Sequence, residues 1–456
     1  MITTKNKTTL HHLFKNMSLI FKHFIILVII AGILFGTTAN AQDRVITLNE
    51  AVKLGIQNSK TLRLSQAKID EAISQYNQAK DLSKPTASAS FGYDRAEIPI
   101  NTISLGKISL GLPQNNNAYL GILSANEVIF NGNKFKYAQQ STELLTQVSR
   151  LDADLNKDQI VYDVITAYYN LYKVQQSKKV IEQNLATIDD QIKQSQRFFD
   201  QGIVTKNDVL RFQLQRANIE LNGIDLETNR KIVNYDLNIL LGLPDATELK
   251  ADTIKEADQQ ISPLTNFIDT AMANRNEIKQ LELRGQVTDV NIYSIHANQS
   301  LNLSASGSAY YVGIRANPLP ESGNDITPIV IGLNLSWNFA TLWTNKNKIA
   351  QAKIQRDEVD ISKNITVDNI KREVNQDYQN YLMAVNRIKL LQTSIAQAGE
   401  NNNIMQSKYK SNIATATDRA DAQTLLYQAQ INLELAKADA GLAYYTLLKS
   451  TGKLNK

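Results

Sequence analysis

The chain has 456 residues, of which 43% are hydrophobic and 20% charged, and its formal net charge is +5. These proportions are typical of a folded protein with a large apolar core. Cysteine is absent and three of the four histidines lie in the first 23 residues, which excludes a disulfide framework, a cysteine nucleophile, a catalytic triad and a zinc site built on cysteine and histidine. Chemistry that uses carboxylates alone survives this test, but no segment of the sequence is recognisable as forming a pocket for it. We predict no catalytic residue, no metal site and no cofactor.

Residues 1–41 are predicted to be a secretory signal peptide. Four lysines precede an apolar run from Phe24 to Phe35, and the small-residue site Ala39-Asn40-Ala41 follows it. The run is about 12 residues long, short of the roughly 20 that a membrane-spanning helix needs. Removal of these four lysines, in a segment without acids, lowers the formal charge from +5 to +1. Nucleic-acid binding then has no electrostatic support.

The prolines mark where long helices can form. None occurs in residues 114–243 or 329–456, and proline is excluded from helix interiors. In the first interval, apolar residues recur every three or four positions, which predicts a long helix over 134–200 of roughly 100 Å at 1.5 Å per residue. After a break at Gly202, a return helix is expected over 208–241.

The second interval repeats this plan, with a long helix expected over 345–410 and a return helix over 418–450. A shift of 210 residues aligns Asp208 with Asp418, Tyr235 with Tyr445 and Gly242 with Gly452. We interpret the chain as an internal duplication. The first repeat spans 42–244 and the second 263–456; a polar connector at 245–262 joins them, and each repeat opens with a helix.

Alternation of apolar and polar residues predicts four strands, over 86–95, 118–130, 300–314 and 327–339. The polar positions carry Ser, Asn and Gly, which suits a membrane barrel with a wet interior, although a soluble sandwich has the same pattern. Four strands cannot close a barrel, and an open edge in lipid leaves backbone groups unsatisfied. Several chains would then share one barrel, of eight, twelve or sixteen strands for two, three or four chains.

The duplicated order of elements resembles the TolC family of outer-membrane efflux proteins. The motifs TLNEAVKLGIQNSKTL from Thr47, GIVTKNDVL from Gly202 and GLNLSWNF from Gly332 are similar to that family's opening helix, first hairpin tip and final strand. The resemblance implies a mainly α protein with a small β part. Three copies would form one twelve-stranded outer-membrane barrel, continued across the periplasm by a hollow cylinder of helices.

The resemblance also assigns roles at the ends of the two helical hairpins. Asp418 and Asp421 lie on one helical face and would form carboxylate rings at the narrowest point of the bore. The alternative is that acids near a helix N-terminus only complement its dipole. Tyr409 would bond Asp208 in the closed gate. The resemblance implies a basic residue at position 414, where this chain has Ala414. Whether Arg419 takes its place stays open.

The tips themselves are the expected contacts for a periplasmic adaptor protein: Gly202, Ile203, Val204 and Thr205 in the first hairpin, and Asn412, Ile413, Ala414 and Thr415 in the second. The implied function is a passive exit channel in a tripartite efflux or type I secretion system. Its partners would be the adaptor, an inner-membrane pump, two further copies of the chain and outer-membrane lipid. The alternative is a soluble periplasmic coiled-coil scaffold or adaptor.

Overall fold

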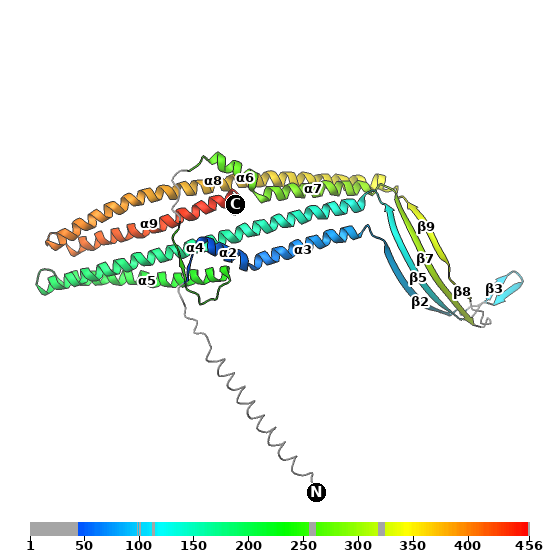
Figure 1. Ribbon diagram of the computed structural model, residues 1–456, viewed down its shortest axis with the longest axis horizontal. Helices are drawn as coiled ribbons and strands as arrows, with labels where there is room; N and C mark the ends of the chain where they lie inside the picture. The colour runs from blue at the N-terminus through cyan, green and yellow to red at the C-terminus, as the bar shows by residue number, and fades with distance from the viewer. Residues whose placement is uncertain are drawn as a thin grey trace, which may run out of the picture.

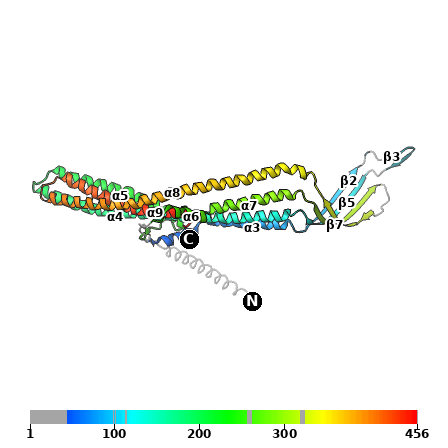
Figure 2. The same ribbon diagram turned by 90° about the horizontal axis from the view of Figure 1, so that it is seen from above.

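The computed structural model describes residues 44–97, 99, 102–111, 115–254, 261–317 and 324–454. The signal peptide predicted for 1–41 and part of the connector lie outside these residues. The described chain is elongated, with the long strands at one end and the turns of two helical hairpins at the other (Figures 1 and 2). No helix among the described residues has the length and apolar character needed to cross a membrane.

One order of elements occurs twice along the chain. The first half contains α2 (Leu48–Asn58), α3 (Lys60–Asp81), β2 (Thr86–Glu97), β5 (Asn115–Phe130), α4 (Lys134–Asp200) and α5 (Lys206–Leu241). The second half contains α6 (Leu264–Asn274), α7 (Asn276–Ala297), β7 (Asn302–Asn317), β9 (Ile329–Ser336), α8 (Thr341–Lys410) and α9 (Ala416–Ser450). The internal duplication inferred from the sequence is therefore present in the fold.

The opening helix of each repeat is broken into two. In the first repeat, Ser59 lies in extended backbone between α2 and α3, and its side chain accepts the Leu62 N–H at 3.2 Å as the N-cap of α3. Arg275 has the same extended backbone between α6 and α7. Both breaks pack against the C-terminal glycine of a return helix, Gly242 or Gly452, which adopts positive φ.

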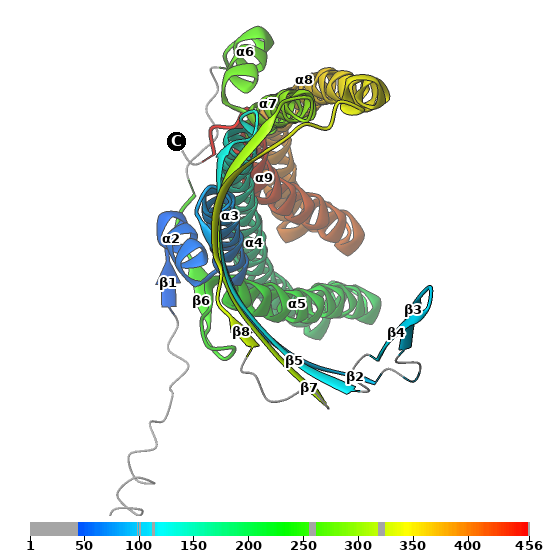
Figure 3. The same ribbon diagram turned by 90° about the vertical axis from the view of Figure 1, so that its right-hand side faces the viewer.

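The strands form a curved antiparallel sheet in the order β2, β5, β7, with β9 and the short β8 (Asn324–Ile326) both paired to β7 (Figure 3). The pairing of β2 with β5 runs from Thr86 opposite Asn126 to Glu97 opposite Asn115. A small hairpin of β3 (Thr102–Leu105) and β4 (Ile108–Gly111), like β8, was not predicted. Within the described residues, neither β2 nor β9 has a partner on its outer edge.

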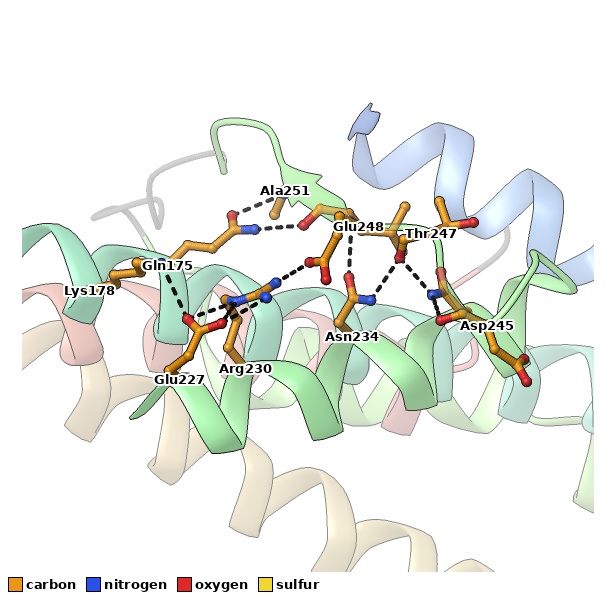
Figure 4. A network of polar contacts seen from close by, with 11 residues as sticks. Gln175, Lys178, Glu227, Arg230, Asn234, Asp245, Thr247, Glu248 and Ala251 are labelled. Carbon is orange, nitrogen blue, oxygen red and sulfur yellow. Dashed lines mark hydrogen bonds and ion pairs between the residues drawn. The ribbon is translucent and has the colours of Figure 1, made fainter. Parts of the chain in front are cut away.

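The connector is fastened to the first hairpin by a network of side chains (Figure 4). Its strand β6 (Leu249–Ala251) pairs in parallel with β1 (Arg44–Ile46). Asn234 of α5 bonds the Thr247 carbonyl and the Leu249 N–H, both at 2.8 Å. Gln175 of α4 bonds Leu249 and Ala251 in the same way, each at 3.0 Å. These amides act as a substitute strand, so the connector satisfies its backbone groups on both sides.

An ion-pair cluster flanks this network. Arg230 bonds both Glu248 of the connector and Glu227, and Lys178 also bonds Glu227, at 3.2 Å. The Arg230 guanidinium lowers the pKa of Glu227 to about 2. The carboxylate is therefore ionised throughout the physiological range.

The main core lies where the two repeats meet, around Tyr168 and Tyr169 of α4. The Tyr168 hydroxyl donates to the Ile46 carbonyl at 3.1 Å, and burial raises its pKa to about 12. Tyr169 is buried and packs its ring 5.9 Å from Tyr445 of α9. A Cβ at Gly441 would lie 2.5 Å from the Tyr169 ring. Glycine at this position allows α9 to approach α4 closely.

We predict that Gly441→Ala lowers stability by about 1–3 kcal/mol, because the added methyl group overpacks the buried Tyr169 ring. The matched control is Gly399→Ala in α8, where a Cβ meets open space and alanine should gain about 0.5–1 kcal/mol from helix propensity. Thermal unfolding of both variants in detergent, followed by far-ultraviolet circular dichroism, tests this. A Gly441→Ala protein as stable as Gly399→Ala would contradict the prediction.

Candidate functional site

The turns of the two hairpins have the same geometry. Gly202 and Asn412 both adopt positive φ, at 72° and 58°. The N–H of the following residue, Ile203 or Ile413, bonds the carbonyl five residues earlier at 2.8 Å in each turn. Both isoleucines are exposed, Ile413 by 75%. Each tip therefore presents one apolar side chain on a hydrogen-bonded turn.

Asp208 and Asp418 belong to capping boxes at the starts of α5 and α9. In the second hairpin, the Asp418 carboxylate accepts the Thr415 N–H at 2.9 Å and the Thr415 hydroxyl at 2.7 Å. Asp208 accepts the same two groups of Thr205, both at 2.8 Å. Both helices begin two residues before the predicted starts at 208 and 418, because these aspartates occupy the third helical position.

The bonds from Thr415 lower the pKa of Asp418. A depressed pKa in the folded state means that the capping bonds stabilise the protein above the ordinary pKa of about 3.9 and are lost as the pH falls through the lower, folded value. In a single chain, the contacts of Asp418 are thus those of an acid that caps the N-terminus of its own helix. Its carboxylate is nevertheless exposed and charged.

Asp421 differs from Asp418. It lies three residues further along α9, is exposed, and makes no hydrogen bond or ion pair within the part of the chain that the structure describes. Residues three apart lie on the same face of a helix. Asp421 is therefore the tip carboxylate without a structural role in the single chain.

Tyr409 joins the two hairpins but does not bond Asp208. Its hydroxyl donates to Ser195 Oγ of α4 at 3.3 Å, and its ring packs 5.9 Å from both Phe198 of α4 and Phe212 of α5. Burial raises its pKa, and the charge of Asp208 adds to this effect. In this structure the Tyr409 hydroxyl bonds Ser195, while the Asp208 carboxylate accepts its bonds from Thr205.

Arg419 is buried inside its own hairpin, only 3% exposed. Its guanidinium donates to Asn402 of α8, and burial lowers its pKa. Its hydrogen-bond partner in the single chain is therefore Asn402 of its own hairpin. Ser195, Phe212 and Asn402 were not predicted, and they match no family motif that we identified in the sequence.

The interface between α4 and α9 near the tips contains a ladder of side-chain amides. Gln423 donates to Asn184 at 2.8 Å, and Asn184 donates to Gln430 at 3.2 Å. The Oε1 atom of Gln191 is buried without a partner. Buried polar groups can exchange their bonds for water when two surfaces separate, so this interface costs less to open than an apolar one.

The site contains no arrangement suited to a metal. Among the described residues, no three histidine or carboxylate side chains come close enough together to hold a metal ion.

The sequence of both repeats matches that of a known protein family. A family model described as outer membrane efflux protein matches residues 51–243 and 267–453, once in each repeat. The outer membrane efflux protein BepC of Brucella suis is 22% identical over 434 residues, covering 94% of this chain and 90% of that protein. The probable efflux pump outer membrane protein TtgC of Pseudomonas putida is 23% identical and covers 84% of this chain and 78% of TtgC.

Solved structures agree on the fold. The outer membrane protein VceC of Vibrio cholerae superposes with a TM-score of 0.72 at 15% identity, over 89% of this chain and 96% of VceC. Family membership decides against a soluble periplasmic scaffold or adaptor. The family model spans both repeats and most of the chain, and the chain therefore belongs to the outer membrane efflux protein family.

Proposed function

We propose that three copies of the chain form a passive exit channel of a tripartite efflux or type I secretion system. A periplasmic adaptor would contact the hairpin tips, and an inner-membrane pump would supply both the energy and the choice of cargo. The observation that carries this proposal is the duplicated hairpin architecture of an outer membrane efflux protein, whose sheet and outer helices are incomplete in one chain.

The unpaired surfaces of one chain support self-assembly. Both outer edges of the sheet lack partners among the described strands, which is costly in lipid. The apolar side chains of β9 are exposed, with Ile331 at 85%, as expected of a surface that faces lipid or a neighbouring strand. Pairing of β2 with β9 of the next chain would remove every open edge, and three chains of four long strands give the twelve-stranded barrel implied by the resemblance.

The outer helices each carry exposed apolar residues. On α5, Leu214 and Leu221 are exposed and seven residues apart. On α8, Met383 and Leu390 are also exposed and seven apart. Residues with this spacing lie on one side of a helix and form coiled-coil seams. We assign α5 of one chain to α8 of the next, a head-to-tail contact that closes into a ring.

The tips would form the gate and the adaptor contact. The exposed Ile203 and Ile413 are suited to an apolar seam with the adaptor's helices. Repetition of Asp421 around a threefold axis would make a carboxylate ring, with Asp418 as a second ring one turn away, and such rings favour cations in a narrow bore. The aromatic contacts of Tyr409 would hold the hairpins together in the closed state.

Trimer formation is tested with the double variant Leu214→Asp, Leu221→Asp. Two charges placed in an apolar seam should dissociate the oligomer, because burying an unpaired carboxylate costs several kcal/mol. Size-exclusion chromatography with light scattering in mild detergent should give a trimer for the natural chain and for the control Gln183→Asp on α4, and monomers for the double variant. A monomeric natural chain would refute the proposal.

Cation preference is tested with Asp421→Asn in planar bilayers. We expect the reversal potential in a salt gradient to move toward the nonselective value, since the ring loses three charges without disturbing a capping box. Asp236→Asn, which removes an exposed acid of α5 far from the tips, should leave it unchanged. Equal effects of the two substitutions would remove Asp421 from the proposed selectivity ring.

Gate closure is tested with Tyr409→Phe and Ser195→Ala. Each variant loses one buried hydrogen bond, worth about 0.5–1.5 kcal/mol, or about 1.5–4.5 kcal/mol if three copies open together. Both should raise single-channel conductance, and the double variant should add little to either. The exposed Tyr293→Phe is the control. Asp208→Ala is combined with Tyr409→Phe in the same way. If that combination, and not the one with Ser195→Ala, is non-additive, then Tyr409 bonds Asp208 rather than Ser195 in the assembled channel.

A further inference from the structure

A groove of about 660 Å³ lies between α4, α5 and α9, at the level where Gln175 and Asn234 hold the connector. In Figure 3, α5 and α9 extend from α4 on the side toward which the sheet is concave. The volume falls within the range of roughly 300–1,000 Å³ that is typical of small-molecule sites. In the proposed assembly this concave side is the wall of the conduit.

Apolar side chains line the floor of the groove, which α4 forms, and the adjoining parts of its two walls, which α5 and α9 form. Val174 and Ile181 come from α4, Leu226 and Val233 from α5, and Ile431 and Leu435 from α9. Val174 and Ile181 are nearly inaccessible, at 5% each. A ligand that entered the groove could therefore bury an apolar body against all three helices.

Contacts bound the groove at both ends. Toward the tip, Tyr427 of α9 hydrogen-bonds Asn222 of α5, and burial raises the Tyr427 pKa. Toward the connector, Lys173 of α4 forms an ion pair with Asp439 of α9 at 2.5 Å. The first contact joins α5 to α9 and the second joins α4 to α9, so the groove is a built feature of the three helices.

The polar lining is neutral. Asn229, Gln428 and Asn432 stand on the exposed walls and offer amide donors and acceptors. Lys173 is the one charged side chain that lines the groove, and Asp439 neutralises it. A carboxylate or ammonium group on a ligand would lose hydration here without gaining a free counter-charge.

We propose that this groove is a transient binding site for neutral, amphipathic cargo molecules with a rigid apolar body and hydroxyl or carbonyl groups at the edges. The inference rests on the proposed channel function, which places the groove on the transport path. Binding must be weak enough for release, because a conduit conducts only what it lets go. The wall then concentrates one chemical class of cargo along the conduit.

The absence of cysteine allows a clean test. Asn432→Cys places a single thiol in the groove, and Asn403→Cys places one on an exposed position of α8 outside it. Both full-length proteins, in lipid nanodiscs, are reacted with a maleimide in the presence of hydrocortisone, a neutral steroid, or of hydrocortisone hemisuccinate, which adds a carboxylate to the same body.

We expect hydrocortisone to slow the labelling of the cysteine at position 432 at least about threefold, in a saturable manner. The hemisuccinate should slow this labelling much less. Neither steroid should change the labelling at position 403. Asn229→Trp, which fills the groove from the α5 wall, should weaken the protection at least about fivefold. Absent protection at position 432, or equal protection at 403, overturns the site; equal protection by both steroids overturns its preference for neutral ligands.

Conductance of the same Asn432→Cys protein separates this inference from the function on which it rests. A protein that conducts but is not protected retains the channel function and loses the groove site. A protein that is protected but does not conduct in bilayers contradicts the channel proposal, while the groove stays a binding site of another kind.

Discussion

The close packing of α9 against α4 is the contact on which the rest of the structure depends. It joins the second repeat to the first at Tyr169 and Gly441, where a side chain as small as alanine would already collide with the tyrosine ring. Around this point Asn234 and Gln175 fasten the connector to the first hairpin, so the connector and the contact between the two hairpins lie in one midsection. Strands extend from one side of it and hairpin tips from the other.

The character of this interface changes along its length. Near the midsection it is apolar and aromatic, and further along Asn184, Gln423 and Gln430 bond across it. At the tips, Tyr409 of α8 packs against Phe198 of α4 and Phe212 of α5 and so joins the two hairpins. An apolar interface resists water, whereas an amide interface accepts it. The energetics therefore favour a fixed midsection and separable tips, which is the mechanical requirement of a gate at one end of a long rod.

A second constraint is that the single chain does not complete its own structure. The edges of the sheet and apolar side chains of α5 and α8 are exposed in one protomer, and a head-to-tail ring would cover all of them at once. The same ring would bring the Asp421 side chains together and turn the groove of α4, α5 and α9 toward a common lumen. Assembly, selectivity and cargo contact would thus follow from one symmetry operation.

The sequence alone determined the helical plan, because proline and apolar periodicity act locally. The helix over 134–200 has the predicted ends, Gly202 breaks the chain where positive φ is needed, and a shift of 210 residues reveals the duplication. Period-two alternation located the four long strands to within a few residues. Asp208, Tyr409, Asp418 and Asp421 were recognisable only because their order resembles a known family.

Tertiary structure alone decided which partners these side chains have. Tyr409 meets Ser195, 214 residues away, rather than Asp208, and Arg419 turns inward to Asn402. The connector, which appeared only polar in sequence, becomes a strand held by amides from α4 and α5. Such contacts depend on how three or four helices come together in space, and no local pattern of residues encodes that distance.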